Sequence, residues 1–192
     1  NQMMILLTEY ILSKKENLDQ SFFIGSTVVS TNMIKHIANY YNVDFKVGLT
    51  GFKWIGKMIN DYKNQKFIFG GEESFGYMVG DFVRDKDAVT SALLACEIAA
   101  AAKSNGSSFY ETLLKLYTKH SFYKERLVSF TKKGMDGAAQ IKKIMIDLRK
   151  NPLTHIDGSK VTFVNDYDAS TEKNMITGEE KNNSILYKSD AS

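Results

Sequence analysis

The sequence predicts an α/β protein: a three-layer α/β/α domain with a mixed, mostly parallel sheet, followed by an incomplete α+β segment. Three observations favour this class. Segments rich in β-branched and aromatic residues alternate with segments of helical periodicity through the first 120 residues, a pattern typical of parallel crossover units. Apolar residues make up 43% of the 192 residues and charged residues 24%, which suits a chain with a real core. The composition then changes after Arg126.

The first three elements follow from periodicity and β propensity. Residues 2–16 place their apolar side chains on one side of a helix and gather charges in the last turn. Residues 22–29 are rich in aromatic and β-branched types, as in a buried strand. Ser30 or Thr31 is suited to cap the helix expected over 32–42.

Two further strand–helix steps complete the predicted sheet. Residues 43–47 alternate apolar and polar side chains and predict a second strand, which glycines end before a helix over 52–62. Residues 66–69 predict a short third strand. Residues 77–83 are suited to return antiparallel to it, which makes the sheet mixed.

The most regular helical pattern covers residues 87–103. Its apolar residues surround almost the whole helix, so we expect it to be mostly buried, with Cys96 as an inert packing thiol. Ser108 and Glu111 form a capping-box pattern that opens the next helix over 109–119.

The sequence beyond the helix over 109–119 predicts fewer helices and strands and a smaller hydrophobic core. A basic amphipathic helix is expected over 137–150 and ends at Pro152, the only proline. Residues 161–164 and 185–187 are candidate strands, separated by a polar stretch that turns at Gly178. These pieces contain too few apolar residues for a core of their own.

We therefore divide the chain into a domain over 1–127 and a truncated second domain over 128–192. The chain opens at Asn1 directly in a helical pattern and ends in a polar stretch, so we expect it to be a piece of a longer protein.

Charge and cysteine content exclude several classes of protein. Lys and Arg number 25 and Asp and Glu number 22, a formal net charge of +3, which is too small to favour nucleic acid or an anionic membrane as a partner. No run approaches the roughly twenty apolar residues of a membrane span, and no secretory pattern opens the chain. A single cysteine excludes an intrachain disulfide and suits a reducing, cytoplasmic environment.

The loop over 70–76 is the first candidate site. It follows a predicted strand, at the edge of an α/β sheet where ligands bind. Its glycines permit a close approach of the backbone, and the carboxylate of Glu72 and the hydroxyl of Ser74 suit the hydroxyl groups of a sugar. A tight turn with two solvated glutamates is an equally good interpretation of the pattern.

Two other loops carry cationic groups. Residues 50–54, with Thr50, Gly51 and Lys53, stand at a strand-to-helix junction, where free backbone N–H groups attract anions. An ordinary helix start with aromatic core residues is the simpler interpretation.

The third loop, 84–87, places Arg84 and Lys86 before a helix that Asp85 or Asp87 can cap; a solvated charged turn is again the simpler interpretation. Together the three loops offer acceptors for hydroxyls and donors for a phosphate, which points to a sugar phosphate. The sequence has no P-loop, CxxC or HExxH motif.

Three stretches, in this order and spacing, resemble the third domain of the α-D-phosphohexomutases, in the phosphoglucomutase/phosphomannomutase branch. They are Thr50-Gly51-Phe52-Lys53, Gly71-Glu72-Glu73-Ser74-Phe75-Gly76 and Arg84-Asp85-Lys86-Asp87. The Gly-Glu-x-Ser element looks like the sugar-recognition loop of the family. The resemblance covers about residues 1–125, and the chain beyond about 130 looks like the start of the fourth domain.

The resemblance implies an enzyme with four domains around one cleft. Such enzymes move a phosphoryl group between the 1- and 6-hydroxyls of a hexose, using a phosphoserine, Mg²⁺ and a hexose 1,6-bisphosphate intermediate. The substrate-binding residues that it implies are Glu72 and Ser74 at the sugar hydroxyls, Thr50 and Gly51 along the pocket, and Lys86, Lys53 and Arg84 at a phosphate or ring oxygen.

Departures from the family limit what this chain is expected to do. Its phosphoserine loop, Asp-rich metal loop and fourth-domain phosphate loop are absent, so we expect no catalytic or metal-binding residue here and no turnover by this chain alone. Leu49 and Ala88 stand where many relatives have proline and glycine, respectively. The expected partners are a hexose phosphate and the remaining domains of the same chain, not nucleic acid or a membrane.

Two other interpretations stay open. One is a non-catalytic module that binds sugar phosphates or mediates assembly, and the other is a scaffold domain whose loops are only turns. The residues do not choose among glucose, mannose and pentose phosphates, although the Ser-Phe-Gly ending of the sugar loop favours glucose.

Overall fold

A computed structural model describes residues 1–183 of the chain. The described residues divide into two compact units, one from Asn1 to Glu125 and one from Arg126 to Asn183. Each unit is considered by itself below. Within the described residues, none of the helices has the length and apolar character needed to cross a membrane.

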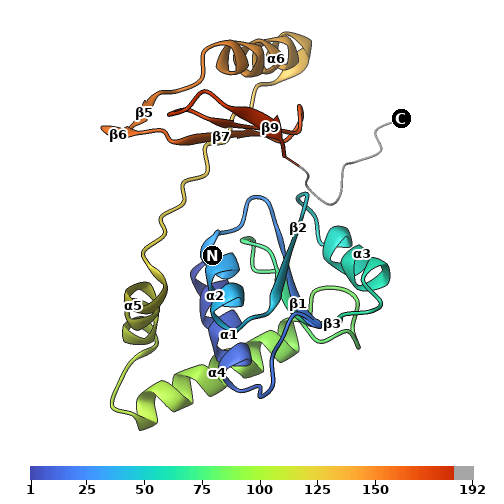
Figure 1. The fold of residues 1–192 in the computed structure, drawn as a ribbon, viewed down its shortest axis with the longest axis vertical. Helices are drawn as coiled ribbons and strands as arrows, with labels where there is room; N and C mark the ends of the chain where they lie inside the picture. The colour runs from blue at the N-terminus through green and yellow to red at the C-terminus, as the bar shows by residue number, and fades with distance from the viewer. Residues whose placement is uncertain (184–192) are drawn as a thin grey trace. The chain divides into compact units, whose positions relative to one another are not determined.

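Four strands form the sheet of the first unit, in the order β2-β1-β3-β4 (Figure 1). β1 (Phe22–Thr27) is parallel to both β2 (Asp44–Gly48) and β3 (Lys66–Gly71), and β4 (Tyr77–Val79) is antiparallel to β3. The predicted mixed, mostly parallel sheet is thereby confirmed.

Five helices belong to the first unit (Figure 1). They are α1 (Gln2–Ser13), α2 (Met33–Tyr40), α3 (Lys53–Asp61), α4 (Ala88–Ser104) and α5 (Phe109–His120). The capping box predicted for α5 is present: Glu111 N–H donates to Ser108 Oγ, and Ser108 N–H donates to the Glu111 carboxylate.

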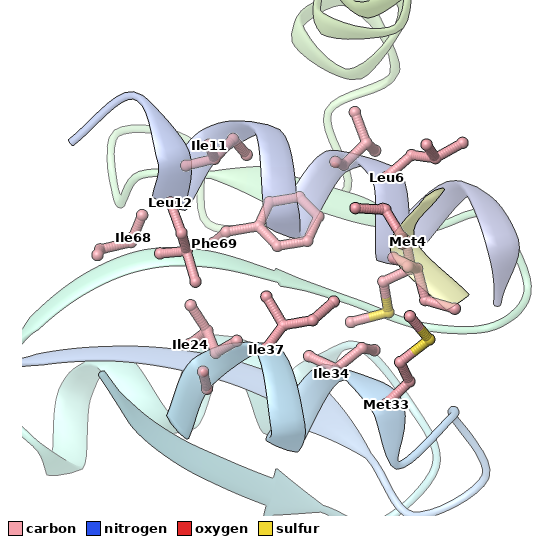
Figure 2. Packing of buried hydrophobic residues seen from close by; sticks show 14 of the residues in the cluster. Met4, Leu6, Ile11, Leu12, Ile24, Met33, Ile34, Ile37, Ile68 and Phe69 are labelled. Carbon is pink, nitrogen blue, oxygen red and sulfur yellow. The ribbon is translucent and has the colours of Figure 1, made fainter. Parts of the chain in front are cut away.

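The apolar side chains form one cluster on each face of the sheet. Figure 2 shows the larger cluster, in which Met4 and Leu12 of α1 and Ile37 of α2 pack on Ile24 and Phe69 of the strands. On the other face, α3 packs on Phe23 and Phe67. Each such fully buried side chain contributes roughly 1.5–3 kcal/mol to stability.

A β-bulge lets β3 serve both faces. Phe23 pairs with Phe67, but the next residue of β1, Ile24, pairs with Phe69, so Ile68 is an extra residue in β3. As a result Ile68 and Phe69 both join the cluster under α1 and α2, whereas Phe67 stays under α3. In a regular strand, successive side chains point to opposite faces, so Ile68 and Phe69 could not both contact the same face of the sheet.

The expected burial of the helix over 87–103 is wrong in the described structure. Only Ile98 and Ala102 of α4 are buried, and Cys96, taken as a packing thiol, is exposed. Val89 is 81% exposed and Leu93 61% exposed. The physical reason is that α4 has neighbours in its own unit, α1, α5 and β4, on one side only, although its apolar residues surround it.

The second unit combines one helix with short antiparallel strands. α6 (Gly134–Lys150) begins three residues before the predicted helix, and β5 (His155–Ile156) pairs with β6 (Ser159–Lys160). β7 (Phe163–Asp166), β8 (Thr171–Asn174) and β9 (Glu180–Asn182) form a separate antiparallel sheet. The Arg149 guanidinium of α6 bonds to the carboxylates of Asp166 and Asp168, which joins helix and sheet. The strand proposed over 185–187 lies outside the described residues.

Candidate functional site

The first loop of the candidate site leaves the sheet at the end of β3. Glu72 follows Gly71 directly, and its N–H donates to the carbonyl oxygen of Gly76 at 2.8 Å, which closes a tight turn. Phe75 adopts a φ of +65° to complete the turn. Gly71 and Gly76 have no space for a side chain: a Cβ would lie 2.6 Å from the Tyr77 ring and from the Lys86 stem, respectively. The backbone here is therefore as close to its neighbours as glycine permits.

The Glu72 carboxylate joins this loop to the second one. Glu72 is only 7% exposed, and its Oε1 accepts a hydrogen bond of 2.9 Å from the Gly51 N–H. Gly51 has a φ of +120°, a conformation that other residues rarely adopt, and this turns its N–H towards the carboxylate. A buried carboxylate held by a backbone N–H is fixed in direction, as a group that recognises a small ligand should be.

The third loop brings Lys86 to the same place. The Lys86 ammonium lies 4.8 Å from the centroid of the buried Phe52 ring, a cation–π contact. A Cβ built on Gly76 would be 2.6 Å from Lys86 Cδ and 3.4 Å from Glu72 Oε2. Glu72 and Lys86 therefore flank the same residue, Gly76, and the three loops converge.

Backbone and ion-pair contacts support this third loop. The Asp87 N–H donates to the carbonyl oxygen of Tyr77 at 2.8 Å, which ties the loop to β4. The Lys86 ammonium is also 3.2 Å from Asp85 Oδ1, an exposed ion pair. Asp87, one of the two predicted candidates, caps α4 by accepting from the N–H groups of Val89 and Thr90 at 3.1 Å each.

The structure does not bring every predicted residue to the point of convergence. Thr50 and Ser74 lie on the two joined loops with exposed side chains. The Lys53 ammonium lies 5.1 Å from the Trp54 ring. The Arg84 guanidinium bonds to the Asn60 side chain, two turns along α3 from Lys53.

Two polar clusters were not predicted. Glu73, which one of the two interpretations above left solvated, accepts from the hydroxyls of Thr27 and Ser30 at 3.4 Å each, and this connects the sugar loop to the end of β1. The hydroxyl residues at and just beyond the end of β1 were the available signal.

The other cluster joins α5 to α1. The buried His120 has its Nε2 2.9 Å from Glu9 Oε2, and Lys119 donates to Glu9 Oε1 at 2.7 Å. Because more than a hundred residues separate these partners, nothing in the local pattern could pair them.

The part of the chain that the structure describes contains no group of three or more His, Cys, Asp or Glu residues suited to hold a metal ion. The acidic residues near the site are engaged otherwise: Glu72 by Gly51, Asp85 by Lys86 and Asp87 by the start of α4. The residues present therefore do not fit the Mg²⁺ that the resemblance implies, and we derive no step through it here.

Comparison with known proteins identifies the family of this fold. Residues 1–117 match the family model "Phosphoglucomutase/phosphomannomutase, alpha/beta/alpha domain III". The chain is 35% identical over 176 residues to a phosphoglucomutase of Staphylococcus epidermidis, an alignment that covers 91% of this chain and 32% of the relative. It is 36% identical over 168 residues to a phosphoglucomutase of Staphylococcus aureus, covering 87% and 30%. The chain thus spans about a third of the length of these curated relatives.

Solved structures show the same fold at low sequence identity. The phosphoglucomutase pp63/parafusin of Paramecium, in an open form, superposes with a TM-score of 0.59 at 14% identity, covering 95% of this chain and 30% of that one. A putative phosphomannomutase of Thermus thermophilus gives a TM-score of 0.51 at 20% identity, covering 61% and 24%. By the match over residues 1–117, the chain belongs to the phosphoglucomutase/phosphomannomutase family and contains its α/β/α domain III.

Proposed function

We propose that this chain is the sugar-recognition part of a phosphohexomutase, an enzyme that interconverts hexose 1-phosphate and hexose 6-phosphate through a phosphoserine and a hexose 1,6-bisphosphate. The observation that carries the proposal is the convergence of Glu72 and Lys86 at Gly76, with Gly51 bonded to the Glu72 carboxylate. The chain has about a third of the length of its relatives, so the nucleophile and Mg²⁺ would be supplied by other parts of the whole protein.

The proposed roles follow from the chemistry of each group. The Glu72 carboxylate retains lone pairs beyond the one used by Gly51, so it can accept from two neighbouring sugar hydroxyls. The exposed hydroxyls of Ser74 and Thr50 can donate or accept on the same sugar. Lys86 supplies a positive charge for a phosphate. We give Lys53 and Arg84 peripheral roles, because their side chains are held by Trp54 and Asn60.

This combination suits a reaction that uses the same sugar in two orientations. A phosphohexomutase must present first one end and then the other end of the hexose to a single phosphoryl donor. A carboxylate and a hydroxyl that hold the middle of the ring can serve both orientations. Phosphoryl transfer depends mainly on positioning and charge stabilisation, so such contacts affect the rate even though they break no bond.

The experiment uses the full-length protein with glucose 1-phosphate as substrate. We expect Glu72→Ala and Ser74→Ala each to lower kcat/KM by about tenfold or more, the loss expected for a hydrogen bond to a charged or oriented group. Glu16→Ala, at an exposed carboxylate beyond α1, is the control and should retain wild-type kcat/KM. Wild-type activity in both site variants, with native melting temperatures, would remove the sugar-loop assignment.

The alternative is a non-catalytic module that binds sugar phosphates or mediates assembly. The exposed Val89 and Leu93 favour an assembly role. Titration calorimetry of the 192-residue chain with glucose 6-phosphate separates the two functions. A complete binding module would give saturable binding at micromolar concentrations, whereas one part of a shared site would bind weakly and show no turnover.

A further inference from the structure

Phe75, in the loop of Glu72 and Ser74, has a backbone conformation that does not suit its side chain. Its φ is +65°, in the left-handed region, where a bulky residue is strained. Among residues 1–183 it is the one apolar side chain with a positive φ. The other such residues are glycines or the small polar residues Asn17, Asn42, Ser121, Asp157 and Ser170.

The turn itself explains the conformation of Phe75 but not its aromatic ring. Residues 73–75 form the tip of the hairpin of β3 and β4, which the bond from the Glu72 N–H to the Gly76 carbonyl oxygen closes. The last residue of a three-residue hairpin loop commonly takes the left-handed conformation, and glycine is the residue that suits it. A phenylalanine there is a departure from the local rule, and such departures are concentrated at ligand-binding sites.

Packing within the first unit does not explain the ring either. Phe75 is 79% exposed, so it forgoes most of the stabilisation that burial of an aromatic side chain provides. Single exposed apolar residues are ordinary on protein surfaces. At Phe75, however, exposure is combined with backbone strain, so neither the turn nor the core favours this residue. A contact made by the working site is the remaining reason for it.

Phe75 lies between two parts of the candidate site. Ser74, a proposed sugar contact, precedes it, and Gly76, which Glu72 and Lys86 flank, follows it. The groups proposed above for the sugar phosphate are all polar or charged. Small-molecule sites usually combine a few such groups with an apolar or aromatic wall. Phe75 is the aromatic residue of the loop over 70–76 and is placed to supply that wall.

We infer that Phe75 contacts the substrate and stacks its ring on the apolar face of the hexose. This inference rests on the proposed function, from which it takes the sugar. A pyranose presents C–H groups on its faces and hydroxyls around its edge, so an aromatic ring suits the face while Glu72 and Ser74 suit the edge. The negative face of the ring attracts the weakly positive C–H groups, and stacking removes apolar surface of both partners from water.

The experiment compares Phe75→Asn and Phe75→Tyr in the full-length protein. Asparagine tolerates the left-handed conformation but has no ring, whereas tyrosine keeps the ring. We expect Phe75→Asn to lower kcat/KM for glucose 1-phosphate by about fivefold or more, whereas Phe75→Tyr should stay within about twofold of wild type. The melting temperature of Phe75→Asn should equal or exceed that of wild type, because the strain is relieved.

A matched control is available in Phe82, which is 71% exposed and lies outside the three loops of the site. Phe82→Asn should retain wild-type kcat/KM. A wild-type kcat/KM in Phe75→Asn would overturn the inference. A lower kcat/KM accompanied by a lower melting temperature would also overturn it, because Phe75 would then support the fold and not the substrate.

Inorganic phosphate separates a contact with the sugar from a contact with another part of the protein. It carries charge as the substrate does but has no sugar ring, so its inhibition constant against glucose 1-phosphate should be unchanged in Phe75→Asn. An inhibition constant that rises as much as kcat/KM falls would mean that Phe75 holds protein around the site, and would contradict the inference.

Failure of this inference and failure of the proposed function give different results. If Glu72→Ala and Ser74→Ala retain full activity, the sugar-loop assignment fails and the contact of Phe75 with the sugar fails with it. If those two variants lose activity while Phe75→Asn retains it, the proposed function stands and the inference about Phe75 is wrong.

Discussion

The helices α3 and α4 differ in what their outer sides present. Each follows a loop of the candidate site: α3 begins two residues after Gly51, and α4 begins two residues after Lys86. The exposed positions of α3 are polar, including Lys57 and Asn60. The exposed positions of α4 include the apolar Val89 and Leu93.

This difference separates two tasks of a helix in this fold. The inward side positions the loop at the N-terminal end of the helix, and both α3 and α4 use buried residues for that purpose, Ile55 and Ile98. The residue types on the outward side indicate whether that side of the helix is suited to water or to protein. The outward side of α3 is suited to water, whereas that of α4 is suited to another layer of protein.

The largest expected effect concerns the inward side of α3. Ile55 is fully buried between α3 and the sheet, so Ile55→Ala should lower the free energy of unfolding of the 192-residue chain by about 2–5 kcal/mol. Val89→Ala on α4 removes an exposed side chain and should change it by no more than about 0.5 kcal/mol. Urea denaturation measures both. A large loss for Val89→Ala would mean that α4 is covered within this chain.

The next largest effect concerns the contact between Gly76 of the first loop and Lys86 of the third loop. A Cβ at Gly76 would lie 2.6 Å from Lys86 Cδ, so Gly76→Ala should displace Lys86 from Phe52. We expect kcat/KM of the full-length protein to fall by about a hundredfold, because a shift near 1 Å in a positioning group has that effect. Gly56→Ala, within α3, meets only an ordinary contact at 3.6 Å and is the control. A wild-type kcat/KM for Gly76→Ala would show that Lys86 has no role in the site.

The two helices also differ at their N-terminal ends. Asp87 caps α4 with its side chain, whereas Phe52 gives α3 no such bond. The Thr90 hydroxyl, followed by the N–H groups of Thr90 and Val89, holds the pKa of Asp87 below its usual 3.8. Asp87→Ala should therefore lower stability at neutral pH.

The pH dependence of that effect has a definite sign. The contribution of Asp87 is fully present above pH 3.8 and is lost as the pH falls through the lower pKa of the folded state. The difference in urea midpoint between wild type and Asp87→Ala should accordingly be largest at neutral pH and vanish in strong acid. A difference that does not change with pH would show that the charge of Asp87 has no part in the cap.

The smallest expected effect is a change in stability at Tyr77 of β4, the strand next to α4. The Tyr77 hydroxyl is buried without a hydrogen-bond partner among residues 1–183, and burial raises its pKa to about 12. Tyr77→Phe should leave stability unchanged or raise it by up to about 1 kcal/mol, because a buried unpaired hydroxyl is costly. In Tyr41→Phe, the hydroxyl that donates to Glu9 at 2.9 Å is lost, so stability should fall by about 1 kcal/mol. Equal losses in the two variants would indicate a hidden partner for Tyr77.

Local pattern was sufficient to predict the order of strands and helices in the first unit and the two capping groups of α4 and α5. It was also sufficient to select the three loops that converge. These features depend on periodicity, turn residues and caps, which act over a few residues along the chain.

Three features needed the tertiary structure. The bulge at Ile68 depends on which neighbours the strand serves, and the pair formed by His120 and Glu9 depends on two helices that are far apart in sequence. The exposure of Cys96 was mispredicted because an apolar helix looks the same in sequence whether its cover belongs to its own unit or to another one.

The most direct test of the central claim is the kinetic comparison of two neighbouring carboxylates. In Glu72→Gln the amide oxygen can still accept the Gly51 N–H, so the loop is preserved while the negative charge is lost. We predict that kcat/KM of the full-length protein for glucose 1-phosphate falls at least tenfold in Glu72→Gln. In Glu73→Gln, whose carboxylate faces Thr27 and Ser30, it should stay near wild type. Equal activity of the two variants would contradict the account.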